Sequence, residues 1–202
     1  MLVGPKYKIC KRLGASVFEK CQTQKFQLAE ANATPRRSRP KRGGGSDFGA
    51  QLLEKQKARF TYGLSESQFS RYVFEAMEGR VPSAALVTRL EARLDNAVFR
   101  AGFVKTRRAA RQLVSHGHVT VNGKRLTIPS HFLKEGDVVA IRTESRTSPL
   151  FMSRTEEAAA TKTPAWMKLE EDTFSFTLTA TPTVAETELA FSPAVIIQFY
   201  SR

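Results

Sequence analysis

Residues 83–142 change once from helical periodicity to strict alternation, and this switch constrains the fold more than any other feature of the sequence. After Ser83 as N-cap, apolar residues recur at helical spacing until Gly102: Val87, Leu90, Leu94, Ala97, Val98 and Ala101. Thr106 is expected to cap a second helix, whose inward face holds Ala109, Ala110, Leu113 and Val114. Alternation begins in VTVNGKRLTI, where Asn122-Gly123 predicts a type I′ hairpin. A second turn, at 134–137, is expected before a short buried strand from Val138 to Ile141. The block predicts two helices packed on a small antiparallel sheet.

The flanks of this block predict further helices and one strand. A helix is expected in LLEKQKARF, with Leu52, Leu53, Gln56 and Phe60 on or near one face and Gly63 at its end. Ser65 and Gln68 have capping-box spacing, and Leu64 with Phe69 suits a hydrophobic staple, so a second helix should follow. Residues 143–163 are expected to be a linker, FSFTLTATPTV a strand, and SPAVIIQFYS a helix despite its β-branched residues. The predicted fold class is α+β.

Positive charge is concentrated in the N-terminal third. The 202-residue chain has a formal net charge of +13, and residues 1–60 hold 14 basic and 4 acidic side chains. Prolines and three consecutive glycines predict an extended loop at 33–47 that orders on its partner, with the basic side chains Arg36, Arg37, Arg39, Lys41 and Arg42. A short helix is expected before the loop, because Ser16 and Glu19 have capping-box spacing. An excess of this size implies a polyanionic partner, either nucleic acid or an anionic membrane.

Membrane and secretory classes are disfavoured. No run approaches the roughly 18 apolar residues that span a bilayer, and MLVGPKYKICKRLG lacks the apolar region of a secretory signal. The basic segments also lack the apolar face of a membrane-surface helix. Two cysteines, Cys10 and Cys21, do not make a disulfide framework, which fits a reducing cytosol, and Cys21 is expected to serve as a small apolar side chain.

Catalytic and metal sites are also disfavoured. His116 and His118 lack the further ligands that zinc needs. The sequence contains no nucleophile elbow, phosphate-binding loop or carboxylate pair. Arg-Leu-Asp at 93–95 also occurs around the catalytic Asp of pseudouridine synthases, but here it is expected inside a helix, with Asp95 bonded to backbone or to Arg93. We expect no enzyme, no cofactor and no metal.

The second helix of the block carries the candidate binding surface. Arg107 and Arg111 are four residues apart, as are Arg108, Gln112 and His116, so two polar rows flank the buried stripe. Arginines in the first turn interact unfavourably with the positive end of the helix dipole, where acidic side chains would stabilise the helix. Their planar guanidinium groups pair bidentately with phosphate, and the hairpin adds Lys124 and Arg125. The alternative is a solvated basic face without a partner, which the charged N-terminal third makes less attractive.

The block RLEARLDNAVFRAGFVKTRRAARQLVSHGHVTVNGKRLTIPSHFLKEGDVVAIR closely resembles the S-four RNA-binding domain. The preceding LEKQKARFTYGLSESQFSRYVFEA is similar to the helical domain of the small-subunit ribosomal protein family of that name. Gly4-Pro5, Trp166 after Pro164 and the terminal Phe199-Tyr200-Ser201-Arg202 resemble the same family, so the likeness covers nearly the whole chain.

The resemblance implies a bacterial-type ribosomal protein that binds small-subunit ribosomal RNA directly and nucleates subunit assembly. It also implies a place near the channel through which messenger RNA enters, beside ribosomal proteins three and five, in a cytoplasmic ribosome, with an organellar one left open. Some members bind zinc through four N-terminal cysteines, but Tyr7 stands at the first of these positions and the later pair is missing, so a zinc-free fold is expected. The segment after Trp166, usually basic, reads TLTATPT, so no RNA contacts are expected from it.

The expected RNA-binding residues combine the family's contacts with the basic N-terminal third. They are Lys6, Lys8, Lys11, Arg12, Arg36, Arg37, Arg39, Lys41, Arg42, Lys55, Lys57, Arg59, Arg107, Arg108, Arg111, Gln112, His116, Lys124 and Arg125.

Four parts are expected in the chain: a basic extended arm at 1–47, a helical domain at 48–88 completed by 189–202, the S-four domain at 89–145, and a linker with a strand extension at 146–188. An RNA-modifying enzyme built on this domain would need a larger catalytic domain than the flanks provide. A stand-alone S-four factor acting on ribosomes is the remaining alternative, although such proteins are usually little more than the domain itself.

Overall fold

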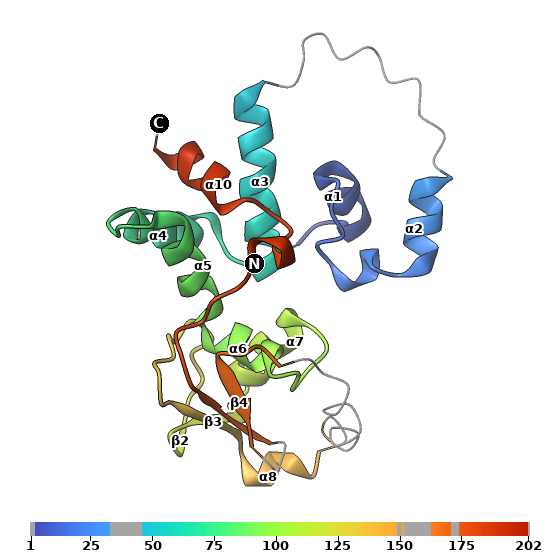
Figure 1. Ribbon diagram of the computed structural model, residues 1–202. Helices are drawn as coiled ribbons and strands as arrows, with labels where there is room; N and C mark the ends of the chain where they lie inside the picture. The colour runs from blue at the N-terminus through green and yellow to red at the C-terminus, as the bar shows by residue number, and fades with distance from the viewer. Residues whose placement is uncertain (1–2, 33–45, 149–150, 152–162, 171–173, 202) are drawn as a thin grey trace. The chain divides into compact units, whose positions relative to one another are not determined.

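The computed structural model describes residues 3–32, 46–148, 151, 163–170 and 174–201. The chain divides into two compact units, one formed by residues 1–86 with 185–202 and the other by residues 87–184 (Figure 1). The boundary lies inside helix α5 (Pro82–Glu91).

The N-terminal segment of the first unit is folded rather than extended. Helix α1 (Lys6–Leu13) ends at Gly14, whose φ of 62° suits glycine, and it is followed by the 3₁₀ turn η1 (Glu19–Cys21) and by α2 (Gln24–Ala31). Cys10, Phe18, Cys21 and Phe26 form a small buried cluster, against which Phe60 packs. This corrects the expectation of an extended arm for residues 6–31; residues 33–45, expected to form the basic loop, lie outside the described residues.

Cys10 and Cys21 are joined by a disulfide. Both side chains are almost fully buried, so the small apolar role expected for Cys21 is confirmed, whereas a single bond between the two cysteines was not predicted. The pairing follows from the turn at η1, which brings the chain back beside α1.

Three helices form the rest of the first unit: α3 (Asp47–Tyr62), α4 (Glu66–Met77) and α10 (Pro193–Tyr200). Ser65 caps α4 by accepting a hydrogen bond from Gln68 N, as predicted. The C-terminal α10 packs beside α3 and α4, and the short 3₁₀ turn η3 (Glu186–Glu188) precedes it (Figure 1). The buried side of α3 is not the predicted one: Gln51, Lys55, Ala58 and Tyr62 are buried, whereas Leu52, Leu53, Gln56 and Phe60 are only partly covered.

The single helix predicted up to Gly102 is two helices. α5 ends at Glu91, and α6 (Leu94–Arg100) begins after Arg93, whose extended backbone forms an isolated β-bridge with Phe132. The Arg-Leu-Asp triplet therefore begins α6 rather than lying inside a helix. Helix α7 (Arg107–Ser115) begins as predicted, because the Thr106 hydroxyl accepts a hydrogen bond from Ala109 N.

An antiparallel sheet with the order β2-β1-β3-β5-β4 completes the second unit. Its strands are β1 (Val119–Val121), β2 (Lys124–Arg125), β3 (Val138–Ile141), β4 (Met167–Leu169) and β5 (Ser175–Leu178), and the short helix α8 (Thr143–Arg146) follows β3. Asn122 and Gly123 have φ of 50° and 77°, which confirms the type I′ turn between β1 and β2. β5 confirms the strand predicted in FSFTLTATPTV, whereas β4 was not predicted.

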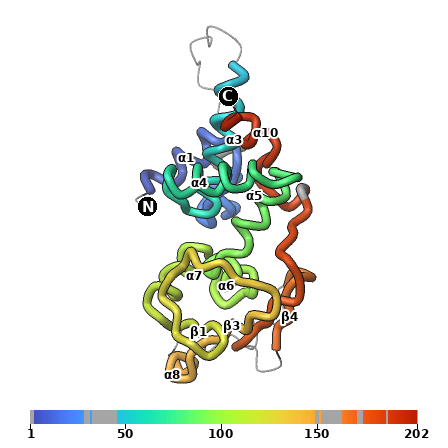
Figure 2. Tube along the Cα trace, turned by 90° about the vertical axis from the view of Figure 1, so that its left-hand side faces the viewer, coloured from blue at the N-terminus to red at the C-terminus, as the bar shows by residue number. Residues whose placement is uncertain are grey.

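Helices α6 and α7 lie together against this sheet (Figure 2) and share one hydrophobic core with it. That core includes Leu113, Phe151, Trp166 and Phe176. Helices and a small antiparallel sheet confirm the α+β class. Among the described residues, no helix is long and apolar enough to cross a membrane.

Candidate nucleic-acid interface

Helix α7 presents one polar row to solvent. Ala110, Leu113 and Val114 are buried, as predicted, whereas Ala109 is only partly covered. Arg108, Gln112 and His116 are all exposed and lie four residues apart, so they form a continuous outward row. Within the described part of the chain, no ion pair or hydrogen bond engages the Arg108 guanidinium or the Gln112 amide.

Arg111 occupies the flank of this row and is held from inside. Its Nε donates to Asp95 Oδ2 at 2.8 Å, and its side chain keeps 30% of its exposure. Asp95 also accepts two hydrogen bonds from Arg93, at 3.0 and 2.8 Å, and both of these side chains are almost fully buried. Asp95 therefore makes the structural contact with Arg93 that the sequence predicted, and it orients Arg111 at the surface.

Arg107 is held by the Asn96 side chain, which in turn is bonded to the buried carboxylate of Glu91. Its Nε donates to Asn96 Oδ1 at 2.7 Å, and its guanidinium lies 4.4 Å from the Phe99 ring centroid. Asn96 Nδ2 donates to Glu91 Oε2 at 2.6 Å, and Glu91 also pairs with Arg100. Arg107 and Arg111 were expected to bind RNA, and both also belong to buried networks that join α6 and α7.

The hairpin brings two further cations toward α7. Lys124 and Arg125 are exposed, and Arg125 Nη2 donates to the carbonyl oxygen of His116 at 3.3 Å. The Arg125 guanidinium covers Gly117, where a Cβ would collide with it and where φ is +76°. We call the exposed surface formed by Arg108, Arg111, Gln112, His116 and Arg125 the α7 face.

The three basic residues predicted on α3 are engaged within the first unit. Lys55 Nζ and Arg59 Nη1 lie 2.6 and 2.7 Å from the two carboxylate oxygens of Glu66, and Lys57 Nζ lies 2.6 Å from Glu54 Oε1. Lys55 is also buried and lies 4.8 Å from the Phe199 ring centroid. Their role in RNA binding stays a prediction. Lys55 and Arg59 join α3 to α4 through Glu66, and Lys55 also contacts α10, whereas Lys57 pairs within α3.

Glu66 is the centre of that cluster. Burial opposes its charge, but hydrogen bonds from Lys55, Tyr200 and Arg59 outweigh burial and lower the pKa of Glu66. Tyr200 donates to Glu66 Oε1 at 2.8 Å, and burial together with this carboxylate raises the pKa of Tyr200.

Helix α1 carries the basic side chains predicted nearest the N-terminus. Lys8, Lys11 and Arg12 are exposed and Lys6 is partly exposed. Lys6 Nζ lies 5.7 Å from the Phe18 ring centroid, and Lys11 Nζ lies 6.0 Å from that of Phe26, so these cations stand over the small cluster. Five predicted residues lie outside the described residues: Arg36, Arg37, Arg39, Lys41 and Arg42.

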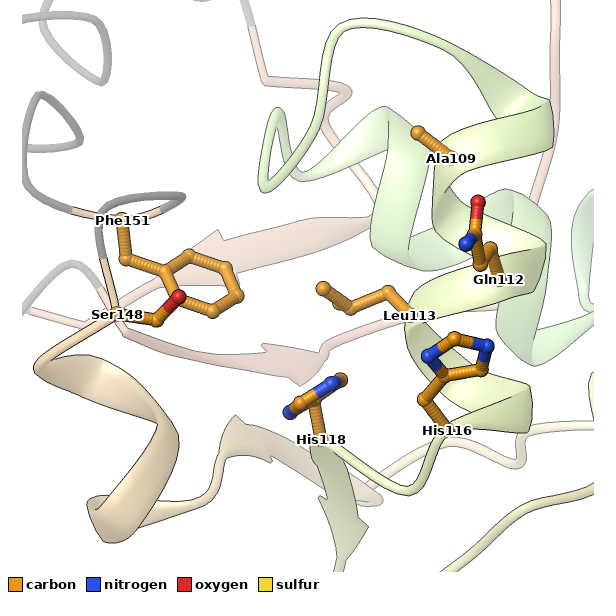
Figure 3. A pocket seen from close by; sticks show the side chains of 7 residues that line it. All are labelled: Ala109, Gln112, Leu113, His116, His118, Ser148 and Phe151. Carbon is orange, nitrogen blue, oxygen red and sulfur yellow. The ribbon is translucent and has the colours of Figure 1, made fainter.

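A hollow beside α7 was not predicted from the sequence. It has a volume of about 160 Å³ and is lined by Ala109, Gln112, Leu113, His116, His118, Ser148 and Phe151 (Figure 3). The sequence placed Gln112 and His116 on one polar row but gave no sign that His118, Ser148 and Phe151 lie opposite them. Across the described ranges, no group of three or more histidine, cysteine or acidic side chains is placed to hold a metal ion.

Comparison with known proteins adds two family matches. The model of the S4 domain matches residues 92–139, and that of the ribosomal protein S4/S9 N-terminal domain matches residues 1–94. The small ribosomal subunit protein uS4 of Roseiflexus castenholzii is 42% identical over 99% of this chain and 98% of its own length. The proteins of the same name from Acetivibrio thermocellus and Chloroflexus aurantiacus are each 38% identical, over 98% and 99% of this chain and 98% of their own lengths.

Proposed function

The chain belongs to the uS4 family of small ribosomal subunit proteins, and from that premise we propose that it binds small-subunit ribosomal RNA directly and nucleates assembly. It is a structural, non-enzymatic ribosomal protein with an S4 RNA-binding domain. The more specific proposal includes a place near the channel through which messenger RNA enters, beside ribosomal proteins three and five. We also propose that the ribosome is cytoplasmic. In this proposal residues 48–88 with 189–202 act as a helical domain, 89–145 as the S-four domain and 146–188 as a linker with a strand extension. Residues 1–47 act as a basic segment that is folded, not extended, over 6–31.

The α7 face is the observation that carries the RNA-binding proposal. Arg108, Gln112 and His116 project from a helix whose start is fixed by the Thr106 cap and whose buried side is locked in the core. Arg111 is pre-oriented by Asp95, and Arg125 by the His116 carbonyl. Pre-oriented guanidinium groups lose little conformational entropy on binding phosphate, which is what a reader of folded RNA requires.

The N-terminal third supplies a second set of contacts in this proposal. Residues 1–60 carry most of the excess positive charge, and the exposed cations of α1 include Lys8, Lys11 and Arg12. Long-range attraction from these charges raises the rate and strength of binding to a polyanion. The five basic side chains between 36 and 42 belong to the same proposal.

The test is the salt dependence of binding between the full-length protein and purified small-subunit ribosomal RNA. We expect log K to fall linearly with log salt, with a slope of about −0.7 to −0.9 for each phosphate contacted. Arg108→Gln should make the slope shallower by about one such unit. Lys134→Gln is the matched control, because Lys134 is an exposed cation of the same unit outside the α7 face.

An affinity that hardly changes with salt would refute direct phosphate binding. Equal slopes for Arg108→Gln and the wild type would remove α7 from the interface. Sedimentation gives an independent check: the native protein should remain with small subunits after a high-salt wash. A pool found only free of ribosomes would favour the stand-alone factor instead.

A further inference from the structure

The hollow beside α7 has an apolar floor and a polar rim. Leu113 and Phe151 belong to the hydrophobic core, and their side chains point toward one another across the base of the hollow (Figure 3). Gln112 and His116 stand at the rim on α7, and His118 faces them from the start of the sheet. An apolar base with a few convergent polar groups is the usual composition of a ligand-binding pocket.

The polar groups of the rim are able to hydrogen-bond a ligand. The Gln112 amide offers both a donor and an acceptor, and it has no partner among the described residues. His118 Nδ1 lies 3.0 Å from Ser145 Oγ, which orients the ring and leaves Nε2 for another partner. None of the seven lining residues is acidic, so the pocket does not repel an anionic ligand.

Cations stand on the surface around this pocket. Arg108 precedes Gln112 by one helical turn on the same exposed row, and Arg125 is bonded to the carbonyl oxygen of His116. A ligand in the pocket that carries phosphates would therefore find guanidinium groups near the mouth. An apolar side chain of a protein partner would fill the floor but leave the rim and these cations unmatched.

We propose that this pocket takes one unstacked base of the bound RNA. Folded RNA is read in large part through splayed bases that stack on Phe or His side chains and hydrogen-bond to neighbouring polar groups. His116 and His118 supply the ring contacts above the buried Phe151, Gln112 reads an edge of the base, and Arg108 holds an adjoining phosphate. The inference rests on the proposed binding of small-subunit ribosomal RNA and adds a base-specific subsite to it.

Filling the pocket tests the inference without changing charge. Ala109→Phe should weaken binding of the full-length protein to small-subunit ribosomal RNA by about 5- to 150-fold, the usual range for losing one stacked base. The slope of log K against log salt should stay that of the wild type, because no phosphate contact is removed. Ser115→Phe, an equally large substitution on an exposed residue of the same helix outside the pocket lining, should bind as tightly as the wild type.

Chemical footprinting supplies a second readout. Dimethyl sulfate and a carbodiimide together modify the Watson–Crick edges of all four unpaired bases. One such base should be protected from modification when the wild type is bound and modified when Ala109→Phe is bound. If Ala109→Phe does not fold, Gln112→Ala decides the question, since it removes the edge-reading amide from an exposed position.

The outcomes separate the inference from the proposed function. A wild-type protein that fails to bind the RNA overturns the proposed function itself. The pocket inference alone is overturned by a different result. In that case the wild type binds tightly and with salt dependence, Ala109→Phe and Gln112→Ala lose no affinity, and no base changes its protection. A variant that binds RNA normally but fails to join assembled subunits also overturns the pocket inference, because it shows that a protein side chain fills the pocket.

Discussion

Replacing Asp95 with asparagine should destabilise the second unit strongly, because Asp95 forms a buried ion pair with Arg93. The Asp95 and Arg93 side chains retain only 3% and 2% of their exposure, and two hydrogen bonds of 3.0 and 2.8 Å join them. Arg111, the third member of the cluster, is 30% exposed and can turn toward water when the acid is lost. Arg93 is too buried to turn toward water in the same way, so Asp95→Asn removes a carboxylate charge from beside a buried guanidinium.

The size of the effect follows from this burial. Removing one partner of a buried ion pair costs about 3–5 kcal/mol, and since an amide oxygen can still accept one bond, we expect about 3 kcal/mol for Asp95→Asn. With a urea m-value of about 1–3 kcal/mol per molar, the unfolding midpoint should fall by about 1–3 M.

Tryptophan fluorescence provides the assay. Trp166 is the single tryptophan and is buried in the core of the second unit, so its fluorescence reports unfolding of the unit that contains Asp95. Glu144→Gln is the matched control, because it also neutralises an acid paired with an arginine in that unit, but Glu144 is 73% exposed. We expect no change of midpoint for the control. Equal midpoints for Asp95→Asn and Glu144→Gln would refute the assignment of stability to the buried pair.

Three further predictions concern acid–base behaviour and backbone conformation. The pKa of Glu66 is lower in the folded than in the unfolded chain, so the stabilisation by its carboxylate is present above about pH 4.5 and is lost as the pH falls through the folded pKa. Glu66→Gln should therefore reduce the loss of stability at acid pH, measured as unfolding of the helical unit. An unchanged pH dependence in this variant would contradict the argument. At the alkaline end the raised pKa of Tyr200 acts in the opposite sense: its contribution is complete below pH 10 and lost above, a dependence that Tyr200→Phe should abolish in a spectroscopic titration. Gly117 and Gly123 have nearly equal positive φ, and the atoms that a Cβ at Gly117 would meet are the end of the exposed Arg125 side chain, which can move aside, so Gly117→Ala and Gly123→Ala should each cost roughly 1 kcal/mol. Urea unfolding measures both, and a much larger loss for Gly117→Ala, removed by adding Arg125→Ala, would show that the Arg125 side chain cannot move aside.

Local signals in the sequence were sufficient where the structure depends on neighbouring residues. Asn122-Gly123 predicted its hairpin because few other dipeptides accept two consecutive positive φ values. Ser65 and Thr106 were recognised as helix caps from the residues that follow them, and both side chains make the cap bond.

The predictions failed where distant segments decide the outcome. The apolar stripe from Val87 to Ala101 gave no sign of a break, because the extended conformation of Arg93 is fixed by Phe132, which lies far along the chain. The buried side of α3 was predicted wrongly because α10 covers it, placing Lys55 against Phe199 near the opposite end of the sequence. Pairing of Cys10 with Cys21 depends on the turn at η1, which the weak capping signal did not specify.

The same dependence explains which predicted binding residues face a ligand. A count of basic side chains treats all of them as available, but an acid placed nearby by the fold converts a cation into a structural contact, as Glu66 does for Lys55 and Arg59. Asp95 acts differently, because it holds one side of Arg111 while the guanidinium remains partly exposed. A buried acid under a surface arginine reduces the net charge of the pair but fixes the direction in which the guanidinium points. This favours recognition of one RNA geometry over general attraction to phosphate. The α7 face therefore has the properties of a shape-reading surface, and the general attraction falls to the cations that no acid of the described residues holds, Arg108 among them.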